Sequence, residues 1–169
     1  DVQLIIIRGS IVNEIEAMIF AIRLANMASF SSGDIPVGVV IIDAQGNIIS
    51  TGHNQRELLR DSTAHAEIIA IRNANKYLNT WKLHDLTLIS TLEPCLMCAG
   101  TIIQSRISKV IFGAWDEKAG ACGSKWDLLR DKRNSSSIEV VGGFLEEENT
   151  RQLKSFFESL RKNQVSGRI

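Results

Sequence analysis

Two short motifs carry the residues best suited to chemistry. Residues 63–68 read TAHAEI and residues 91–98 read TLEPCLMC, which brings together a histidine, a glutamate and two cysteines. One imidazole nitrogen and two thiolates suit Zn²⁺, and three protein ligands leave an open position, which distinguishes a catalytic zinc from a closed structural one. We therefore predict that His65, Cys95 and Cys98 bind one zinc ion per subunit, with an activated water in the open position.

Glu67 lies two residues after His65, so the two side chains do not share a direction on a helix. At a helix start the carboxylate can still lean over the activated water without binding the metal. A carboxylate in that place takes a proton from the water and returns it to a leaving nitrogen. Glu67 is therefore predicted to be the catalytic proton carrier of a hydrolytic deamination.

Each motif alone has a simpler explanation. A histidine near a helix start often only forms a hydrogen bond, and an isolated C-x-x-C pair is more often redox-active or a structural zinc site. Together, in this order, the motifs match the H-x-E and P-C-x-x-C signature of zinc deaminases. The third cysteine, Cys122, is expected to be a small buried residue and not a ligand.

The apolar pattern places both motifs where a strand or loop leads into a helix. Helices are expected over residues 13–29, 64–77, 95–105 and 146–162, and strands over residues 37–43, 48–52, 86–90, 109–114 and 138–141. Strands that alternate with helices imply parallel crossovers of one hand, which bring the two helix starts together. The fold class is predicted to be α/β, with helices covering a sheet.

Composition predicts one compact domain. The 169 residues are 44% hydrophobic, enough for a sizeable single core. We expect a domain over residues 11–163, an extension of unknown order over residues 1–10 and a frayed tail over residues 164–169.

The charge of the chain is balanced. Lys+Arg and Asp+Glu both number 19, so a nucleic-acid surface would have to be a local patch.

Location is predicted from what the sequence lacks. The longest apolar runs are too short to cross a bilayer, so no membrane association is expected. The LIII run near the start has no basic flank or small-residue cleavage site, which argues against a signal peptide. Three cysteines do not form a disulfide framework, so we expect a reducing compartment, the cytoplasm.

Longer strings resemble a known family. They are IPVG (35–38), GHN (52–54), STAHAEI (62–68), TLEPCLMCAG (91–100), SRI (105–107) and FGAWDEKAGACGS (112–124). The chain resembles the tRNA-specific adenosine deaminases of the bacterial TadA type. The last string is the most specific, since relatives that act on free guanine, cytosine or dCMP share only HAE and PCxxC.

The resemblance implies a fold, a reaction and partners. The fold is the three-layer α/β/α cytidine deaminase-like fold, with a central, largely parallel mixed five-stranded sheet. The reaction is hydrolytic deamination of adenosine to inosine at the wobble position of a tRNA anticodon. The implied partners are the anticodon stem-loop and a second copy of the chain in a homodimer.

The resemblance also implies roles for residues near the base. Asn54 is similar to the residue that hydrogen-bonds the flipped base, and Val37 to a wall of the base pocket. The simpler alternative for Asn54 is a turn cap at the end of a strand.

Four outer residues resemble positions that meet RNA. Asp116 and Lys118 resemble loop residues beside the target nucleotide, and Phe157 and Arg161 resemble last-helix residues that hold the anticodon stem-loop. Lys118 and Arg161 could instead be solvated charges, and Phe157 could belong to the core. Trp115 departs from the family, where this loop position is often polar or basic.

Two other functions remain open at this stage. The first is a zinc-dependent deaminase of a free nucleobase or nucleotide such as guanine, cytosine or dCMP, which would use the same metal site. The second is a non-catalytic RNA-binding subunit that keeps zinc structurally. The presence of Glu67 argues against this subunit, which would be expected to lack the proton carrier.

Overall fold

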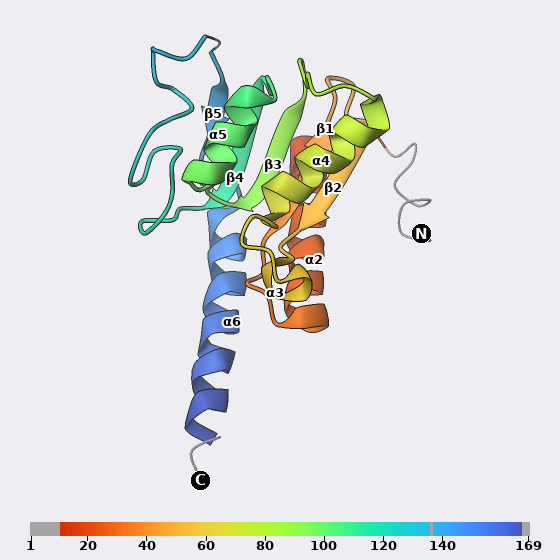
Figure 1. Ribbon diagram of the computed structural model, residues 1–169. Coiled ribbons are helices and arrows are strands. Elements are labelled where there is room, and N and C mark those ends of the chain that lie inside the picture. Colours follow the sequence, from red (N-terminus) through yellow and green to blue (C-terminus); the bar gives the residue numbers. More distant parts are fainter. Residues whose placement is uncertain (1–10, 136, 167–169) are drawn as a thin grey trace.

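The computed structural model describes residues 11–135 and 137–166. A five-stranded sheet lies between helices on both of its faces (Figure 1). The strands are β1 (Gly38–Ile42), β2 (Ile48–His53), β3 (Thr87–Leu92), β4 (Lys109–Ala114) and β5 (Glu139–Val141). The helices are α2 (Glu14–Ser32), α3 (Arg56–Leu59), α4 (Ala66–Leu78), α5 (Leu96–Gln104) and α6 (Glu146–Ser166).

The sheet is mixed, with the strand order β2-β1-β3-β4-β5. Strand β1 pairs antiparallel with both β2 and β3, whereas β3 pairs parallel with β4 and β4 with β5. Four strands therefore run in one direction and β1 alone runs against them. The predicted layered α/β fold with a mixed five-stranded sheet is confirmed, and the crossovers through α4 and α5 join strands that point the same way.

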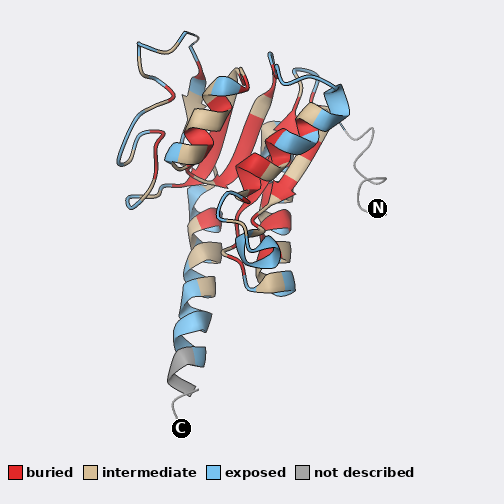
Figure 2. Ribbon diagram, in the orientation of Figure 1, coloured by how far each residue is buried: buried red, intermediate tan, exposed pale blue. Residues whose placement is uncertain are grey.

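The two faces of the sheet bury different helices. Val39, Ile41 and Phe112 pack in one core cluster with residues of α4 and α5, and Val40 and Ile111 pack in the other with residues of α2. Strand β1 is buried along its whole length, as its apolar sequence predicts. Figure 2 shows this buried sheet between helices whose outer surfaces are exposed.

The first helix begins and ends at recognisable caps. Asn13 and Glu16 form a capping box, in which each side chain accepts a hydrogen bond from the other residue's backbone N–H. Gly33 follows the helix with φ 72°, a left-handed conformation that glycine adopts without strain. The helix therefore runs to Ser32, three residues beyond the predicted end.

Helix α3 was not predicted, because its sequence, within QRELLRDS, is polar and short. Its first turn is capped from elsewhere in the chain. The carboxylate of Asp34 accepts hydrogen bonds from the N–H groups of Glu57 at 2.8 Å and Leu58 at 3.3 Å. These partners are 23 and 24 positions apart in sequence, so local pattern does not reveal the helix.

The structure describes only part of the two chain ends for which boundaries were predicted. Helix α6 continues to Ser166, while residues 1–10 and 167–169 lie outside the described residues. Figure 1 shows α6 extending well beyond the end of the sheet. Within the part of the chain that the structure describes, no helix is both long and apolar enough to span a bilayer.

Candidate active site

The two motifs meet where α4 and α5 begin. His65 is the N-cap residue of α4 and Cys95 is the N-cap residue of α5, and neither side chain caps its own helix. Both side chains are therefore free to face each other. Gly52 allows α4 to approach the sheet, because a Cβ atom there would lie 2.4 Å from the carbonyl oxygen of Ala66.

The predicted metal-binding side chains form one cluster. Nδ1 of His65 lies 3.6 Å from Sγ of Cys95 and 3.5 Å from Sγ of Cys98, and the three ligand atoms lie within 4.8 Å of one another. A tetrahedral zinc with its usual bond lengths separates a nitrogen and a sulfur ligand by about 3.6 Å. The donor set and its spacing therefore fit one zinc ion.

The electrostatics of the cluster favour one thiolate even without metal. A hydrogen bond from Cys98 lowers the pKa of the Cys95 thiol to about 4, against the effect of burial, and His65 contributes in the same direction. The same hydrogen bond, with burial, raises the pKa of Cys98. The pair therefore favours one thiolate and one thiol, with the charge favoured on Cys95.

Glu67 is buried in the first turn of α4, with 4% of its surface exposed. Burial raises the pKa of its carboxyl group above the usual value. Glu67 follows His65, the N-cap residue, in the first turn of α4, so the carboxyl belongs to the helix end that carries the cluster. A buried carboxyl with a raised pKa can hold and release a proton closer to neutral pH.

Asn54 lies buried just beyond the end of β2, close to Val37. Its backbone N–H donates to the carbonyl oxygen of Val37 at 3.0 Å, and its side-chain Nδ2 donates to that of Ile35 at 3.1 Å. Its side-chain oxygen Oδ1 is buried and has no hydrogen-bond partner among the residues that the structure describes. Asn54 thus anchors the 35–37 segment and also leaves one acceptor for a ligand.

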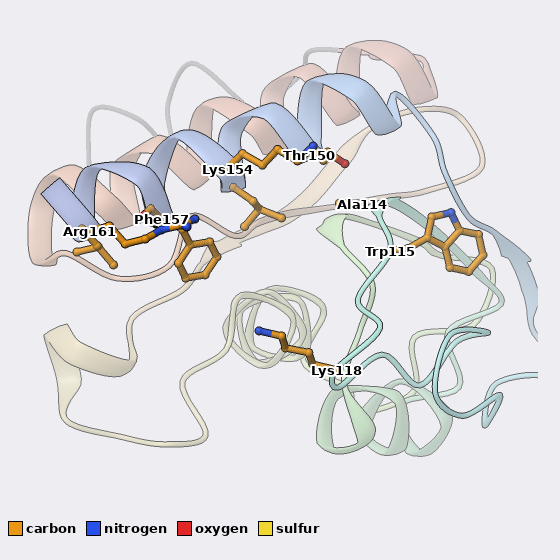
Figure 3. Close-up of a pocket in the computed structure, with 9 residues that line it drawn as sticks. Ala114, Trp115, Lys118, Thr150, Lys154, Phe157 and Arg161 are labelled. Carbon is orange, nitrogen blue, oxygen red and sulfur yellow. Dashed lines mark hydrogen bonds between the residues drawn. The ribbon is translucent and has the colours of Figure 1, made fainter.

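Three of the predicted RNA-contact residues line a single groove of about 600 Å³ (Figure 3). The groove is lined by Ala114, Trp115, Lys118, Thr150, Leu153, Lys154, Phe157, Leu160 and Arg161. It lies between α6 and the loop after β4, and none of these residues is acidic. Phe157 is 41% exposed, so its side chain is available at the surface and is not part of the core.

Asp116 and Trp115, in the loop after β4, make contacts within the protein. The carboxylate of Asp116 accepts hydrogen bonds from the N–H groups of Lys118 at 3.0 Å and Ala119 at 3.2 Å, so it shapes its own loop. The ring of Trp115 packs edge-on against Phe112, with ring centroids 4.8 Å apart. Figure 3 shows this indole pointing away from Phe157.

Sequence reasoning missed Glu93, which is 2% exposed. Its carboxylate accepts hydrogen bonds from the N–H groups of Asp116, Cys122 and Ser124 in the loop after β4. A glutamate between an apolar strand and Pro94 is the available signal, because buried carboxylates require partners. Cys122 is buried and lies outside the metal-binding cluster.

Comparison with known proteins identifies the family. Residues 12–114 match the model of the cytidine and deoxycytidylate deaminase zinc-binding region. The chain is 45% identical over 148 residues to a tRNA-specific adenosine deaminase of Bacillus subtilis, which covers 88% of this chain and 91% of the relative. The chain therefore belongs to the cytidine and deoxycytidylate deaminase zinc-binding family and, within it, to the tRNA-specific adenosine deaminases.

Solved structures agree on the fold. A structure from work on A-to-I editing by tRNA:A34 deaminases superposes with a TM-score of 0.76 at 34% identity, covering 81% of this chain and 98% of the other. A guanine deaminase from Nitrosomonas europaea superposes with a TM-score of 0.74 at 23% identity, covering 88% and 86%. The second likeness shows the fold alone and does not support a free-base substrate.

Proposed function

We propose that this protein deaminates adenosine to inosine at the wobble position of a tRNA anticodon. The observation that carries the proposal is the buried carboxyl of Glu67 beside the cluster of His65, Cys95 and Cys98. That arrangement suits hydrolytic deamination. The wobble substrate is supported by the relatives, which are named tRNA-specific adenosine deaminases, and by the structural match to a tRNA:A34 deaminase.

In this proposal His65, Cys95 and Cys98 would hold one zinc ion per subunit, and the ion would supply Lewis-acid activation of the hydrolytic water. Glu67 would accept a proton from the water as the water oxygen bonds to C6 of adenine, and would deliver that proton to the exocyclic nitrogen, which leaves as ammonia when the C6–N bond breaks. Its burial excludes competing solvent, and its raised pKa suits a group that must both take and return a proton.

Asn54 and Val37 are proposed to hold the flipped base. The unpaired, buried Oδ1 of Asn54 is an acceptor for an N–H group of the base, and a site that leaves this oxygen unpaired bears the cost of its desolvation. Val37 is 7% exposed, and its carbonyl oxygen accepts a hydrogen bond from the backbone N–H of Asn54. Its side chain is proposed to form part of the pocket wall.

The RNA surface is proposed to be the groove between α6 and the loop after β4. Lys118 and Arg161 are positioned for phosphates, and the exposed ring of Phe157 offers an apolar face for a nucleotide. Asp116 contributes by holding the turn that presents Lys118. A local cationic groove also explains how a chain with no net charge can bind RNA.

We further propose a homodimer that acts in the cytoplasm. Leu58 and Leu59 in α3 and Leu96 in α5 are large, apolar and exposed, so their side chains are available for contact with a second copy. All three cysteines are free, which suits a reducing compartment. Sedimentation of the purified chain tests the dimer directly.

The function is tested with an anticodon stem-loop that carries adenine at the wobble position. We expect a far higher kcat/KM for it than for adenosine, adenine, guanine or cytosine, because flanking nucleotides supply binding energy that positions the base. Moving the adenine one nucleotide along the loop should abolish most of the rate. Efficient turnover of free guanine or cytosine with an untouched stem-loop would overturn the proposal.

A further inference from the structure

The carboxylate of Glu93 accepts hydrogen bonds from the loop of residues 116–124. Its Oε2 accepts hydrogen bonds from the N–H of Asp116 at 2.9 Å and from the hydroxyl of Ser124. Its Oε1 accepts hydrogen bonds from the N–H groups of Cys122 at 3.0 Å and Ser124 at 2.9 Å. Both oxygens are therefore used by one loop.

The loop is also fastened to the residues that follow Glu93. The N–H of Ala121 donates to the carbonyl oxygen of Pro94 at 2.9 Å, and Gly120 pairs with Cys95 as an isolated β-bridge. A Cβ atom on Gly120 would lie 2.3 Å from the carboxyl carbon of Glu93. The backbone of the loop therefore packs directly against this carboxylate, and a larger residue at position 120 would clash with it. The loop is thus attached to three consecutive residues, the last of which belongs to the metal-binding cluster.

We propose that Glu93 is a positioning residue that fixes the RNA groove relative to the metal site. The loop that it binds carries Lys118, whose side chain lines the groove (Figure 3). Glu93 itself is buried and acts through that loop. The role rests on the proposed function, because it sets the spacing between the reacting base and the neighbouring nucleotide. Charge-assisted hydrogen bonds are the stronger kind and suit this task.

Glu93→Gln tests the role at nearly constant size. The substitution replaces one acceptor oxygen with an NH₂ donor, which then faces N–H groups that also donate. We expect the KM for the wobble-adenine stem-loop to rise about ten-fold or more, because a buried set of charge-assisted hydrogen bonds is broken. Zinc content and kcat should stay close to wild type. Ser124→Ala removes only the hydroxyl donor and should raise KM less.

A double-mutant cycle separates positioning from general destabilisation. In the Glu93→Gln background Lys118→Ala should have little further effect on KM, because the loop no longer holds Lys118 in place. Arg161 lies on α6 and not on the loop, so Arg161→Ala should keep its full effect on KM in the same background. Full additivity of Glu93→Gln with Lys118→Ala, or loss of zinc and kcat together, would overturn the positioning role.

Amide hydrogen exchange provides a readout that needs no substrate. Glu93→Gln, or Ser124→Ala if the first variant does not fold, should speed exchange at residues 116, 122 and 124 while the strands stay protected. Unchanged exchange at these amides would overturn the inference. If the wild-type chain failed to deaminate the stem-loop, the proposed function would fall, and the exchange result would still decide whether Glu93 holds the loop.

Discussion

Sγ of Cys98 lies 3.5 Å from Nδ1 of His65, although the two residues are 33 positions apart in the chain. His65 precedes α4 and Cys98 lies within α5, and both helices pack on the same face of the sheet. The geometry of the metal site therefore depends on how two crossover helices pack.

Zinc content should distinguish the cysteines. Cys98→Ala should lose most of the metal, because two protein ligands hold zinc far more weakly than three, whereas Cys122→Ala should keep about one zinc per chain. The two positions are well matched, since both cysteines are fully buried. Metal analysis of the purified variants is the measurement. Equal loss from both would indicate a closed site with four ligands.

Glu67→Gln should separate proton transfer from metal binding. The amide keeps the size of the side chain but cannot accept the proton, so turnover should fall by about 10³-fold while zinc content is retained. Glu57→Gln, an exposed glutamate in α3, is the control and should keep wild-type turnover. Single-turnover inosine formation measures both. Near-normal turnover by the Glu67 variant would refute its role.

Removal of zinc should expose one reactive thiolate. A hydrogen bond from Cys98 lowers the pKa of Cys95 to about 4, so this thiol is mostly ionised at neutral pH. After chelation, iodoacetamide should modify Cys95 first, at a rate that stays flat from about pH 7 to pH 5 and falls as the pH approaches 4. Burial raises the pKa of Cys122, which should react slowly. Peptide mass spectrometry identifies the modified residue, and preferential labelling of Cys122 would contradict this prediction.

Asn54→Ala should weaken catalysis without removing metal. Loss of the buried acceptor should lower kcat/KM for the stem-loop by about 10- to 100-fold, as expected for a hydrogen bond to a bound base. Asn73→Ala is a matched control, because Asn73 also donates through Nδ2 to a backbone carbonyl, that of Thr51, but lies exposed on α4. Equal losses from both variants would assign Asn54 a structural role only.

Salt dependence should report how many phosphates the groove binds. The cations of the groove are Lys118, Lys154 and Arg161, in a chain of zero net charge, so log K should fall only shallowly with log salt. Arg161→Ala and Lys154→Ala should each weaken stem-loop binding and reduce the slope by about 1. Lys132→Ala, an exposed cation outside the groove, should change neither quantity. Fluorescence titrations at several salt concentrations measure both, and an unaltered slope in the groove variants would place the RNA elsewhere.

The chemistry of the site could be predicted from sequence because it depends on residue types at short spacing. His65 and Glu67 are two residues apart and Cys95 and Cys98 are three apart, so local helix geometry already restricts where their side chains point. The alternation of strands and helices also predicted that both motifs would meet at one edge of the sheet. The family strings added the prediction that Asn54 contacts the base, but they did not reveal its unpaired oxygen.

Only the tertiary structure decided which distant residues share a surface and which are occupied elsewhere. Lys118 and Phe157 come from a loop and a helix that meet only after folding, so sequence could not show that they line one groove. Asp116 and Glu93 carry the same charged group in neighbouring segments, yet one binds its own turn and the other binds the whole loop. The role of Glu93 depends on backbone N–H groups that lie 23 to 31 positions away in the sequence, and residue type alone does not encode that placement.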